Sequence, residues 1–385
     1  MTKEFIDFVN AHKDEDTARL LLSAARYPSI DMPAAVQQIE GLRTAREKWP
    51  SLLASEYYIY PPRLNREQSS SEAAARYKTS VISSFTAHLS PFTVADLTGG
   101  MGVDTLAFAK VAQHVDYVER DPQLCALMEH NLRALGVDNV SVHCADSMEW
   151  LMAAGRYDLL FVDPARRATS GHKVAAFEDC MPNILEHAEI LRMHCRTLMV
   201  KASPMIDIDL GCRQLGNVKE VHVVGVKGEC KEVLFVCGEP QGEPRITCGK
   251  VSFTRSEEAA TEARYVKTMG HYLYEPDAML MKGGPFKIIG ERYGIEQLGH
   301  NTHLYTSEKR LDGFPGRVFE VLQELKLSRK EVAALIPEGK AHVVTRNYPV
   351  EAEALQRQLG LREGGDIFVV ATSVGDRKCG FLCKM

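Results

Sequence analysis

The first 90 residues carry the hydrophobic pattern of helices. In residues 16–27 and 31–49, apolar side chains recur at steps of three and four, which places them on one face of a helix. Pro61 and Pro62 interrupt the pattern, and the serines at 69–71 are suited to cap a further helix. No convincing alternating strand precedes Ser90, so we expect an N-terminal helical region over residues 1–90.

From Phe92 the pattern changes to short apolar runs separated by helical stretches. The runs lie at 92–98, 115–119, 139–144, 157–163, 196–203, 218–226 and 231–238. Alternation of this kind is typical of a mostly parallel sheet covered by helices. Because only a short KGEC segment joins the last two runs, they are expected to form an antiparallel hairpin at one edge. The prediction is an α/β domain over residues 91–240, with five parallel strands followed by a hairpin.

Beyond about residue 240 the pattern changes again. We expect a linker and a small accessory domain over 241–313, for which a ferredoxin-like fold is one candidate, and a small α+β domain over 314–385. The predicted elements of the last domain are helices at 318–326 and 351–360 and strands at 341–347, 366–374 and 378–385.

Composition narrows the class of protein without naming its substrate. The 385 residues are 45% hydrophobic and 25% charged, which is ordinary for a globular protein. Ten cysteines are spread singly and no His/Cys cluster has ligand spacing, so neither a metal site nor a disulfide framework is expected. No run approaches the roughly 20 apolar residues of a membrane span. We therefore expect a cytoplasmic protein; its net charge of -5 excludes a uniformly basic one but leaves room for a local basic face.

The strongest chemical signal is VADLTGGMGVDT at 94–105, an apolar strand followed by Gly99, Gly100 and Gly102 and then a helix. Glycines at such a turn let the backbone approach a ligand closely. A dinucleotide fingerprint would place its third glycine where this chain has Thr105. The acidic Asp96 ahead of the loop suits S-adenosylmethionine (SAM), which carries an ammonium group and no pyrophosphate. A plain strand-to-helix turn is the alternative interpretation of the glycines alone.

Acidic residues end the next two predicted strands. Glu119 follows the glycines by about 20 residues, where a carboxylate can accept both hydroxyls of a ribose. Asp146 follows the third strand, where its side chain or the neighbouring backbone can read an adenine amino group. Either acid alone is more often a solvated strand end, but the series predicts an adenosine ligand at the carboxyl ends of the strands.

The fourth strand ends in FVDPARR at 161–167. This segment resembles the Asp/Asn-Pro-Pro-aromatic motif of class I methyltransferases that act on nitrogen atoms. The resemblance implies that Asp163 and the Pro164 carbonyl hold a target amine, so that catalysis is mainly positioning. Ala165 departs from the motif, and Arg166 stands where an aromatic ring stacks on the base; a guanidinium can stack there, pair with phosphate, or form a surface salt bridge. Carbon methylation through Cys180 or Cys195, both in apparent helices, ranks lower.

The resemblance extends from about residue 65 to 238 and is to class I SAM-dependent methyltransferases, within them the trimethylguanosine synthase-like RNA methyltransferases. It implies a Rossmann-like seven-stranded methyltransferase sheet and SAM as cofactor. The catalytic residues implied are Asp163, Pro164 and Arg166. The cofactor-binding residues expected are Gln68, Ser69, Asp96, Thr98, Gly99, Gly100, Met101, Gly102, Asp104, Thr105, Glu119, Arg120, Ala145, Asp146, Ser147 and Asp163.

The last 70 or so residues resemble the THUMP-like domain that accompanies some bacterial methyltransferases, and true THUMP domains bind RNA. Their basic residues supply a modest positive content that is equally suited to a solvated face: Lys326, Arg329, Lys330, Lys340, Arg346, Arg377 and Lys378. The leading hypothesis is an enzyme that methylates a base nitrogen in RNA. The alternatives are a methyltransferase for a small molecule or protein, and an RNA-binding scaffold whose methyltransferase fold is catalytically silent.

Overall fold

A computed structural model describes residues 1–86, 91–166, 177–239 and 242–385 of the chain. The chain folds into two compact units. Unit 1 comprises Met1–Lys219 and Glu232–Gln241, and unit 2 comprises Glu220–Lys231 and Gly242–Met385. The domain boundaries expected from the sequence, near residues 90, 240 and 313, stay a proposal.

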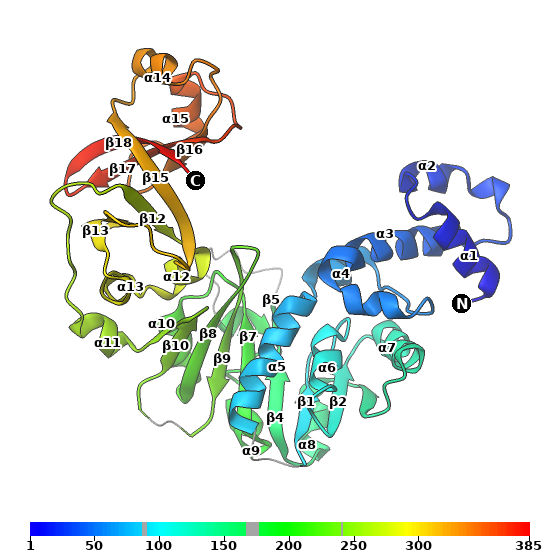
Figure 1. The fold of residues 1–385 in the computed structure, drawn as a ribbon. Coiled ribbons are helices and arrows are strands. Elements are labelled where there is room, and N and C mark those ends of the chain that lie inside the picture. The colour runs from blue at the N-terminus through cyan, green and yellow to red at the C-terminus, as the bar shows by residue number, and fades with distance from the viewer. Residues whose placement is uncertain (87–90, 167–176, 240–241) are drawn as a thin grey trace. The chain divides into compact units, whose positions relative to one another are not determined.

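Unit 1 begins with helices (Figure 1). They are α1 (Lys3–His12), α2 (Thr17–Leu22), η1 (Ala24–Arg26), α3 (Met32–Lys48), η2 (Pro50–Ala54), α4 (Arg63–Gln68) and α5 (Glu72–Thr86). Ser71 caps α5, as the serine run predicts, because its Oγ accepts the Ala74 N–H at 3.2 Å. Helix α3 begins at Met32, with Pro33 in its first turn and with Asp31 as the N-cap whose carboxylate accepts the Ala34 N–H, so sequence signals fix both starts.

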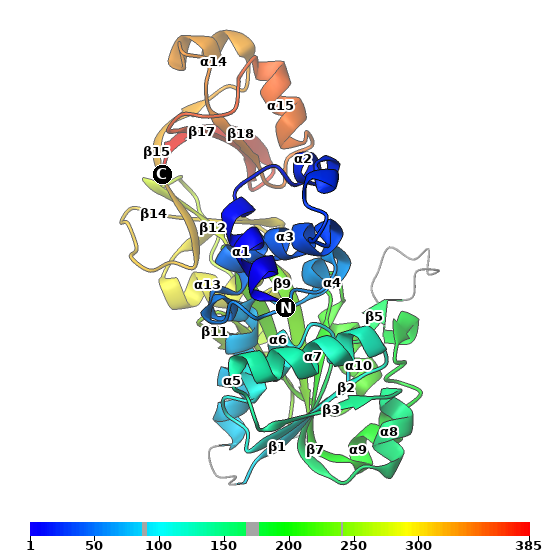
Figure 2. The same cartoon turned by 90° about the vertical axis from the view of Figure 1, so that its right-hand side faces the viewer.

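The large sheet has the expected alternation of strand and helix. Its strands are β1 (Thr93–Asp96), β2 (His114–Glu119), β3 (Val140–Cys144), β4 (Tyr157–Val162), β7 (Cys195–Ala202), β8 (Val218–Val226), β9 (Glu229–Cys237), β10 (Arg245–Cys248) and β11 (Val251–Phe253). The helices between them are α6 (Val103–Phe108), α7 (Pro122–Leu135), α8 (Ser147–Ala153), α9 (Ala188–Met193) and α10 (Ile208–Leu215). Figure 2 shows α5, α6 and α7 on one side of the sheet and α8, α9 and α10 on the other.

The strand order β11-β10-β8-β9-β7-β4-β1-β2-β3 confirms the α/β fold class. Strands β3, β2, β1, β4 and β7 are parallel, and β9 runs antiparallel to β7. Within the described residues the sheet has nine strands instead of seven, because β10 pairs with β8 and β11 with β10. Parallel strands share one carboxyl-end edge, so this order brings the ends of β1, β2 and β4 together.

A short two-stranded sheet, β5 (Ala165–Arg166) with β6 (Cys180–Met181), follows β4. The segment η3 (Phe177–Asp179) precedes β6. Cys180 therefore lies in a strand and Cys195 begins β7, so the expectation that both cysteines lie in helices is wrong. Arg166 keeps a described backbone in β5, whereas its side chain lies outside what the structure describes, as does all of Arg167.

Unit 2 has a second sheet of order β13-β14-β12-β15-β18-β17-β16 among its described residues. The strands are β12 (Tyr272–Pro276), β13 (Glu296–Gly299), β14 (Thr302–Ser307), β15 (Gly316–Leu325), β16 (His342–Thr345), β17 (Ile367–Val374) and β18 (Arg377–Lys384). Its helices are α11 (Arg255–Ala260), α12 (Ala278–Gly283), α13 (Phe286–Tyr293), α14 (Arg329–Leu335) and α15 (Ala352–Leu359). The expected helix at 318–326 is wrong: this segment is β15, which β12 and β18 flank on its two edges.

Among the described residues, no helix combines the length and apolar character that crossing a bilayer requires. Within the same ranges, no three His, Cys, Asp or Glu side chains gather as candidate metal ligands.

The N-terminal helices share a buried cluster with the glycine loop and α7. Trp49, Tyr58 and Tyr60 pack in one cluster with Met101 and Tyr117. The Trp49 indole N–H donates to the Ser70 carbonyl at 2.7 Å, and the Asn131 side chain bonds both the N–H and the carbonyl of Ile59. These hydrogen bonds fix the segment before α4 against the sheet domain.

Gly41 lies in α3 where the Tyr60 ring approaches. We predict that Gly41→Ala lowers stability, although Ala in a helix interior is normally favoured over Gly by about 0.5–1 kcal/mol. The added Cβ would lie 2.3 Å from the Tyr60 ring, and such overpacking costs about 1–3 kcal/mol. The thermal midpoint followed by circular dichroism measures this. Gly155→Ala is the control, since its Cβ meets no atom within 4 Å. An unchanged or higher midpoint for Gly41→Ala would contradict this packing.

Candidate functional site

The glycines of the loop after β1 meet two different structural requirements, room for side chains and an open backbone. A Cβ on Gly99 would lie 2.2 Å from the Tyr117 ring, and one on Gly102 would lie 2.5 Å from the Met128 sulfur. Both glycines therefore make room for side chains of the protein itself. Gly100 has φ +53° and its Cβ position has no atom nearer than 3.8 Å, so this residue is where the backbone leaves open space.

Glu119 at the end of β2 is tied to that loop. One carboxylate oxygen accepts the Gly100 N–H at 3.0 Å, and the other accepts the N–H groups of Arg120 and Asp121 at 2.8 and 2.9 Å. The Tyr117 hydroxyl donates to the Gly100 carbonyl at 2.7 Å from the same strand. The loop and the end of β2 are thus locked together, with the carboxylate held in a fixed orientation.

Asp96 at the end of β1 is buried with 1% of its surface exposed. Its carboxylate accepts the Thr105 hydroxyl at 2.6 Å and the Thr98 N–H at 3.1 Å. Burial raises the pKa of Asp96 to about 7; the Thr105 hydrogen bond opposes this rise, and the nearby carboxylate of Asp104 adds to it. Asp96 is therefore poised to change charge near neutral pH.

Asp146 is exposed and serves as the N-cap of α8. Its side chain accepts the N–H groups of Met148 and Glu149 at 2.9 and 3.2 Å. The neighbouring Ala145 N–H donates to the Glu119 carbonyl at 3.0 Å. The capping role accounts for the acid at this position, and any reading of an adenine by Ala145, Asp146 or Ser147 stays a prediction.

The end of β4 meets the glycine loop through Asp163. Its N–H donates to the Thr98 hydroxyl at 2.7 Å, which connects the two predicted parts of the site. Its carboxylate accepts a hydrogen bond from Lys201 at 2.5 Å. Asp163 and Pro164 are half-buried and Ala165 is exposed, so this segment lies at the surface of the site.

Lys201 belongs to a buried row of alternating charges, here called the lysine–carboxylate chain: Asp163, Lys201, Glu232, Lys78 and Asp104. Lys201 Nζ lies 3.9 Å from Glu232 Oε2, and Lys78 Nζ lies 2.7 Å from Glu232 Oε1 and 3.0 Å from Asp104 Oδ1. The side chains of Lys78 and Glu232 are 0% and 3% exposed. Three carboxylates share two ammonium groups, so the chain carries a net negative charge when all five groups are ionised.

The pKa values in this chain follow from its pairing. Burial acts to lower the pKa of Lys201, but Asp163 and Glu232 hold it above its usual range, so Lys201 is a cation at neutral pH. Burial acts to raise the pKa of Asp104, but Lys78 and Lys201 hold it below its usual range. Ser70 completes the inner end by donating to Asp104 Oδ2 at 2.6 Å.

Sequence reasoning missed Lys78, Lys201 and Glu232 as functional residues. Lys201 lies in the apolar run at 196–203, in which no site residue was predicted. Lys78 lies in α5, the helix that follows Gln68 and Ser69 at the end of α4, and Glu232 lies in β9. For Lys201 the available signal was a charge that directly follows the apolar residues 198–200, which indicates a buried partner.

Gln68 and Ser69 lie at the end of α4. Gln68 is exposed, and the Ser69 hydroxyl donates to the Arg66 carbonyl at 3.0 Å. Their contact with a cofactor stays a prediction.

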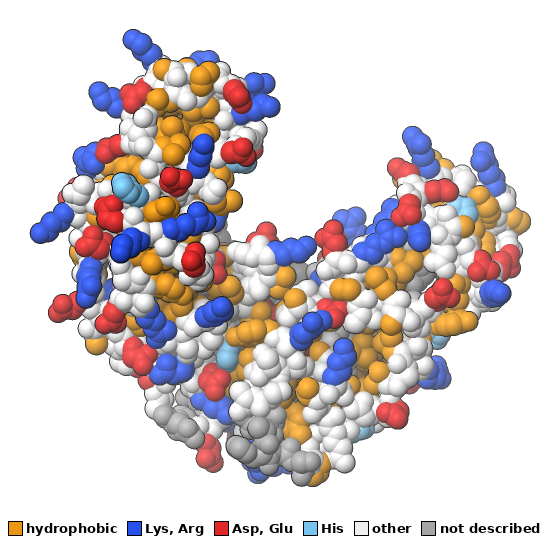
Figure 3. Space-filling model, viewed as in Figure 1, with side chains coloured by type: hydrophobic (Ala, Val, Ile, Leu, Met, Phe, Trp, Pro, Cys, Tyr) orange, Lys and Arg blue, Asp and Glu red, His pale blue; other side chains and the backbone are white. Residues whose placement is uncertain are grey.

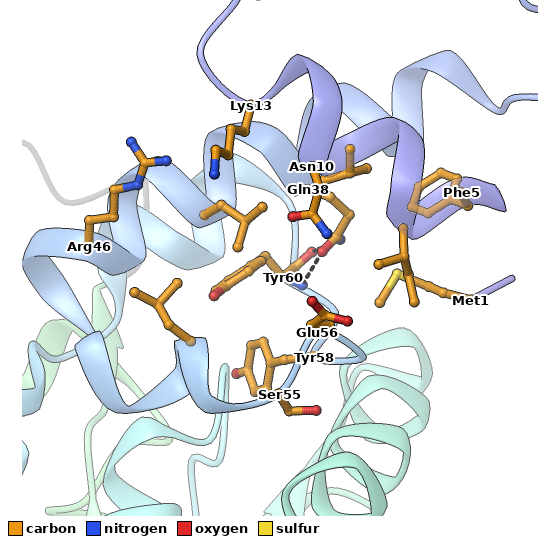
Figure 4. Close-up of a pocket in the computed structure, with 14 residues that line it drawn as sticks. Met1, Phe5, Asn10, Lys13, Gln38, Arg46, Ser55, Glu56, Tyr58 and Tyr60 are labelled. Carbon is orange, nitrogen blue, oxygen red and sulfur yellow. Dashed lines mark hydrogen bonds between the residues drawn. The ribbon is translucent and has the colours of Figure 1, made fainter. Parts of the chain in front are cut away.

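A separate pocket of about 260 Å³ lies among the N-terminal helices (Figure 4). Tyr58 and Tyr60 form its floor, with Lys13 and Arg46 at one end and Met1 and Phe5 at the other. None of the residues predicted to bind the cofactor lines it. This pocket is therefore distinct from the strand-end site.

Basic residues of unit 2 are partly neutralised. Arg377 pairs with Glu324, and Arg346 pairs with Glu275. On the face drawn in Figure 3, Lys and Arg side chains are interspersed with Asp and Glu. Charge alone therefore gives that face no single sign.

Comparisons with known proteins agree with this geometry. The family model for protein-L-isoaspartate(D-aspartate) O-methyltransferase matches residues 56–171, and models for a ferredoxin-like and a THUMP-like domain match 272–315 and 316–385. The crystal structure of a proposed methyltransferase from Porphyromonas gingivalis W83 has a TM-score of 0.84 and 29% identity, and the match covers 99% of this chain and 97% of that one. An uncharacterised SAM-dependent methyltransferase of Mycobacterium tuberculosis H37Rv is 26% identical over 287 residues, which cover 73% of this chain and 77% of that protein.

Over most of its length the chain is similar to SAM-dependent methyltransferases, and this similarity assigns it to that class of enzyme. Part of this methyltransferase, 76 residues or 19% of the chain, is 41% identical to a 23S rRNA (uracil(1939)-C(5))-methyltransferase of Shewanella amazonensis, of which the match covers 17%.

The site residues of this methyltransferase fit its cofactor, SAM. Carboxylates stand at the ends of β1, β2 and β4, where they complement a cationic ligand that carries ribose hydroxyls, and the same charges would repel a pyrophosphate. Gly100 leaves the backbone open beside Glu119. These acceptor groups and the open backbone at Gly100 therefore suit SAM.

Cys180 and Cys195 are poor nucleophiles for carbon methylation by this methyltransferase. Both are buried. Burial raises the pKa of Cys195 to about 12, so its thiol stays protonated at neutral pH. The structure supports the low rank that the sequence gives to a cysteine mechanism.

For this methyltransferase, we predict that SAM affinity rises with pH between about 5 and 8, relative to that of S-adenosylhomocysteine. SAM carries one more positive charge, so ionised Asp96 favours it, and with a pKa of about 7 in the free protein Asp96 releases a proton as SAM binds. Calorimetry in buffers of different ionisation enthalpy measures both affinity and proton release.

Asp96→Asn, which keeps the shape, is the matched variant and should flatten the pH dependence of the affinity ratio. The same raised pKa means that the stability contribution of Asp96 falls as pH rises from about 4 to 7, because only the folded state holds the proton there. A pH-independent affinity ratio in the unmodified protein would refute the role given to Asp96.

Proposed function

We propose that this methyltransferase transfers the SAM methyl group to RNA, with the acceptor held at the end of β4. The observation that carries the proposal is Asp163, whose backbone is hydrogen-bonded to the glycine loop and whose carboxylate is fixed by Lys201. The two ends of the reaction, cofactor loop and acceptor loop, are thereby held in one rigid piece.

Positioning is the main catalytic task in such a site. SAM, when bound, supplies a methyl group on a positively charged sulfur that is already a good leaving group. The protein's residues then have to align the acceptor atom, exclude water and receive a proton. Thr98 Oγ1 accepts the Asp163 N–H at 2.7 Å and so links the two loops. Glu119, Asp96 and the Gly100 backbone are proposed to hold the cofactor end.

RNA as substrate is supported by the THUMP-like match at 316–385 and by the partial match to an rRNA methyltransferase. The acceptor atom that the motif resemblance after β4 implies is a base nitrogen, with the Pro164 carbonyl and Arg166 at the base. A protein acceptor is the second candidate, since the protein-L-isoaspartate(D-aspartate) O-methyltransferase model matches residues 56–171.

Substitutions of Asp163 and Glu119 are predicted to affect different steps, methyl transfer and SAM binding. Asp163→Ala should reduce methyl transfer at least about a hundredfold with SAM affinity changed little, because it contacts the acceptor. Glu119→Ala should weaken SAM binding about 10- to 100-fold, since hydrogen bonds to a charged group contribute about 1.5–3 kcal/mol. Glu129→Ala, on an exposed face of α7, is the control. Equal loss of SAM binding in both site variants would overturn the assignment.

The first test of the proposal is calorimetric titration with SAM, and separately with NADH, followed by tritium transfer from labelled SAM to total bacterial RNA. SAM binding with label in RNA is the expected result. SAM binding without label in RNA would overturn RNA as the substrate and direct the assay to protein and small-molecule fractions.

A further inference from the structure

Resting on the proposed function, we propose that the acceptor is a hydroxyl group, which in RNA is the ribose 2′-hydroxyl, with Asp163 receiving its proton and Lys201 stabilising its oxygen. This assigns a catalytic role to Lys201 and replaces a base nitrogen as the preferred acceptor atom.

The inference starts from the ion pair at the acceptor loop. Lys201 Nζ lies 2.5 Å from Asp163 Oδ2, and the lysine side chain is only 12% exposed. Asp163 itself is 35% exposed, so a substrate can reach the carboxylate, and the ammonium group is held in contact with it. Any acceptor that approaches this carboxylate also approaches a permanent positive charge.

That charge distinguishes the two kinds of acceptor. A nitrogen acceptor gains positive charge as the methyl group is transferred, so a neighbouring ammonium group opposes the reaction. A hydroxyl acceptor gains negative charge on oxygen as its proton leaves, so the same ammonium group assists it. An amine needs only a hydrogen-bond acceptor to orient its lone pair, whereas a hydroxyl needs a base and a cation, and this site holds both.

The inner part of the lysine–carboxylate chain keeps the cation in place. Glu232 on β9 lies between Lys201 and Lys78, and Lys78 on α5 is in turn held by Asp104. Helix α5 runs alongside the sheet in Figure 1 and delivers Lys78 from outside the strands. Lys201 is thus restrained from both sides, by Asp163 at the surface and Glu232 inside.

The reaction balances without a further reagent. The hydroxyl oxygen forms a bond to the methyl carbon with a lone pair, and the carbon–sulfur bond breaks with its electron pair left on sulfur. The hydroxyl proton passes to the Asp163 carboxylate and then to solvent. Lys201 donates a hydrogen bond to the oxygen during transfer and keeps its own proton.

Within an RNA strand the chemistry selects one group. The phosphates carry no alcohol and the bases present nitrogen and carbonyl groups, so each internal nucleotide offers a single hydroxyl, at the ribose 2′ position. A hydroxyl acceptor in RNA is therefore the 2′-hydroxyl, whichever base it carries.

The test uses the full chain, tritium-labelled SAM and unmodified RNA transcribed in vitro from bacterial ribosomal RNA genes, followed by alkaline digestion. A 2′-O-methyl group blocks alkaline cleavage at its own nucleotide, so the expected label appears in alkali-resistant dinucleotides. Label in mononucleotides would mean base methylation and would overturn this inference while leaving the proposed function intact. No label in RNA would overturn both.

Variants of Lys201 test its role by two measurements, the rate of methyl transfer and the ratio of the affinities for SAM and S-adenosylhomocysteine. Lys201→Met removes the cation at similar length, and it should reduce transfer at saturating SAM at least a hundredfold. The same change should raise the affinity for SAM relative to S-adenosylhomocysteine, because a positive charge near the sulfonium is lost. Lys201→Arg keeps the cation and should restore part of the transfer rate.

A merely structural Lys201 would behave differently. Affinity for both ligands would then fall together with the thermal midpoint, and Lys201→Arg would be no more active than Lys201→Met, which would overturn the catalytic role. Lys231→Met, at a half-exposed lysine of β9, is the control for loss of a lysine charge and should leave transfer and both affinities unchanged.

Discussion

The lysine–carboxylate chain is the constraint on which the rest of the site depends. Moving a charge from water into a protein interior is costly, and removing one partner of a buried pair costs about 3–5 kcal/mol. Lys78, Asp104 and Glu232 can be buried beside Lys201 only if α5, α6, β7, β9 and the end of β4 meet at one place. The requirement that each charge be paired therefore positions five segments together and fixes the Asp163 carboxylate at the end of β4.

Much of the fold could be predicted because apolar runs and loops of ordinary length determine a parallel sheet almost uniquely. The prediction of a helix over residues 318–326 is wrong for a physical reason. Its apolar residues satisfy both a three-to-four step and, through Phe319, Val321 and Leu325, a step of two. Pairing with β12 and β18 on both edges, a long-range event, decides for the strand. The pairing of β10 with β8 is equally non-local.

The candidate site was predictable where an acid directly follows a strand, as for Asp96, Glu119 and Asp163, because the carboxyl ends of parallel strands converge. The contact between Lys201 and Glu232 could not be predicted, because it depends on the register of β7 with β9. Lys201 stands opposite Leu234, and Glu232, two residues along, shares its face of the sheet. The sequence explains the glycines only by close approach of a ligand. The structure adds a second reason, because Gly99 and Gly102 leave room for the side chains of Tyr117 and Met128.

Lys78 lies in a helix that precedes the first strand of the sheet. This position limits how the sheet domain could be exchanged between proteins. A piece that began at β1 would contain every strand of the parallel sheet, yet Asp104 and Glu232 would be left buried without the ammonium group between them. It would also lose Trp49 and Tyr60 from the cluster that supports the glycine loop. The sheet therefore cannot be transferred to another protein alone, and a recombinant that preserves function has to include the N-terminal helices.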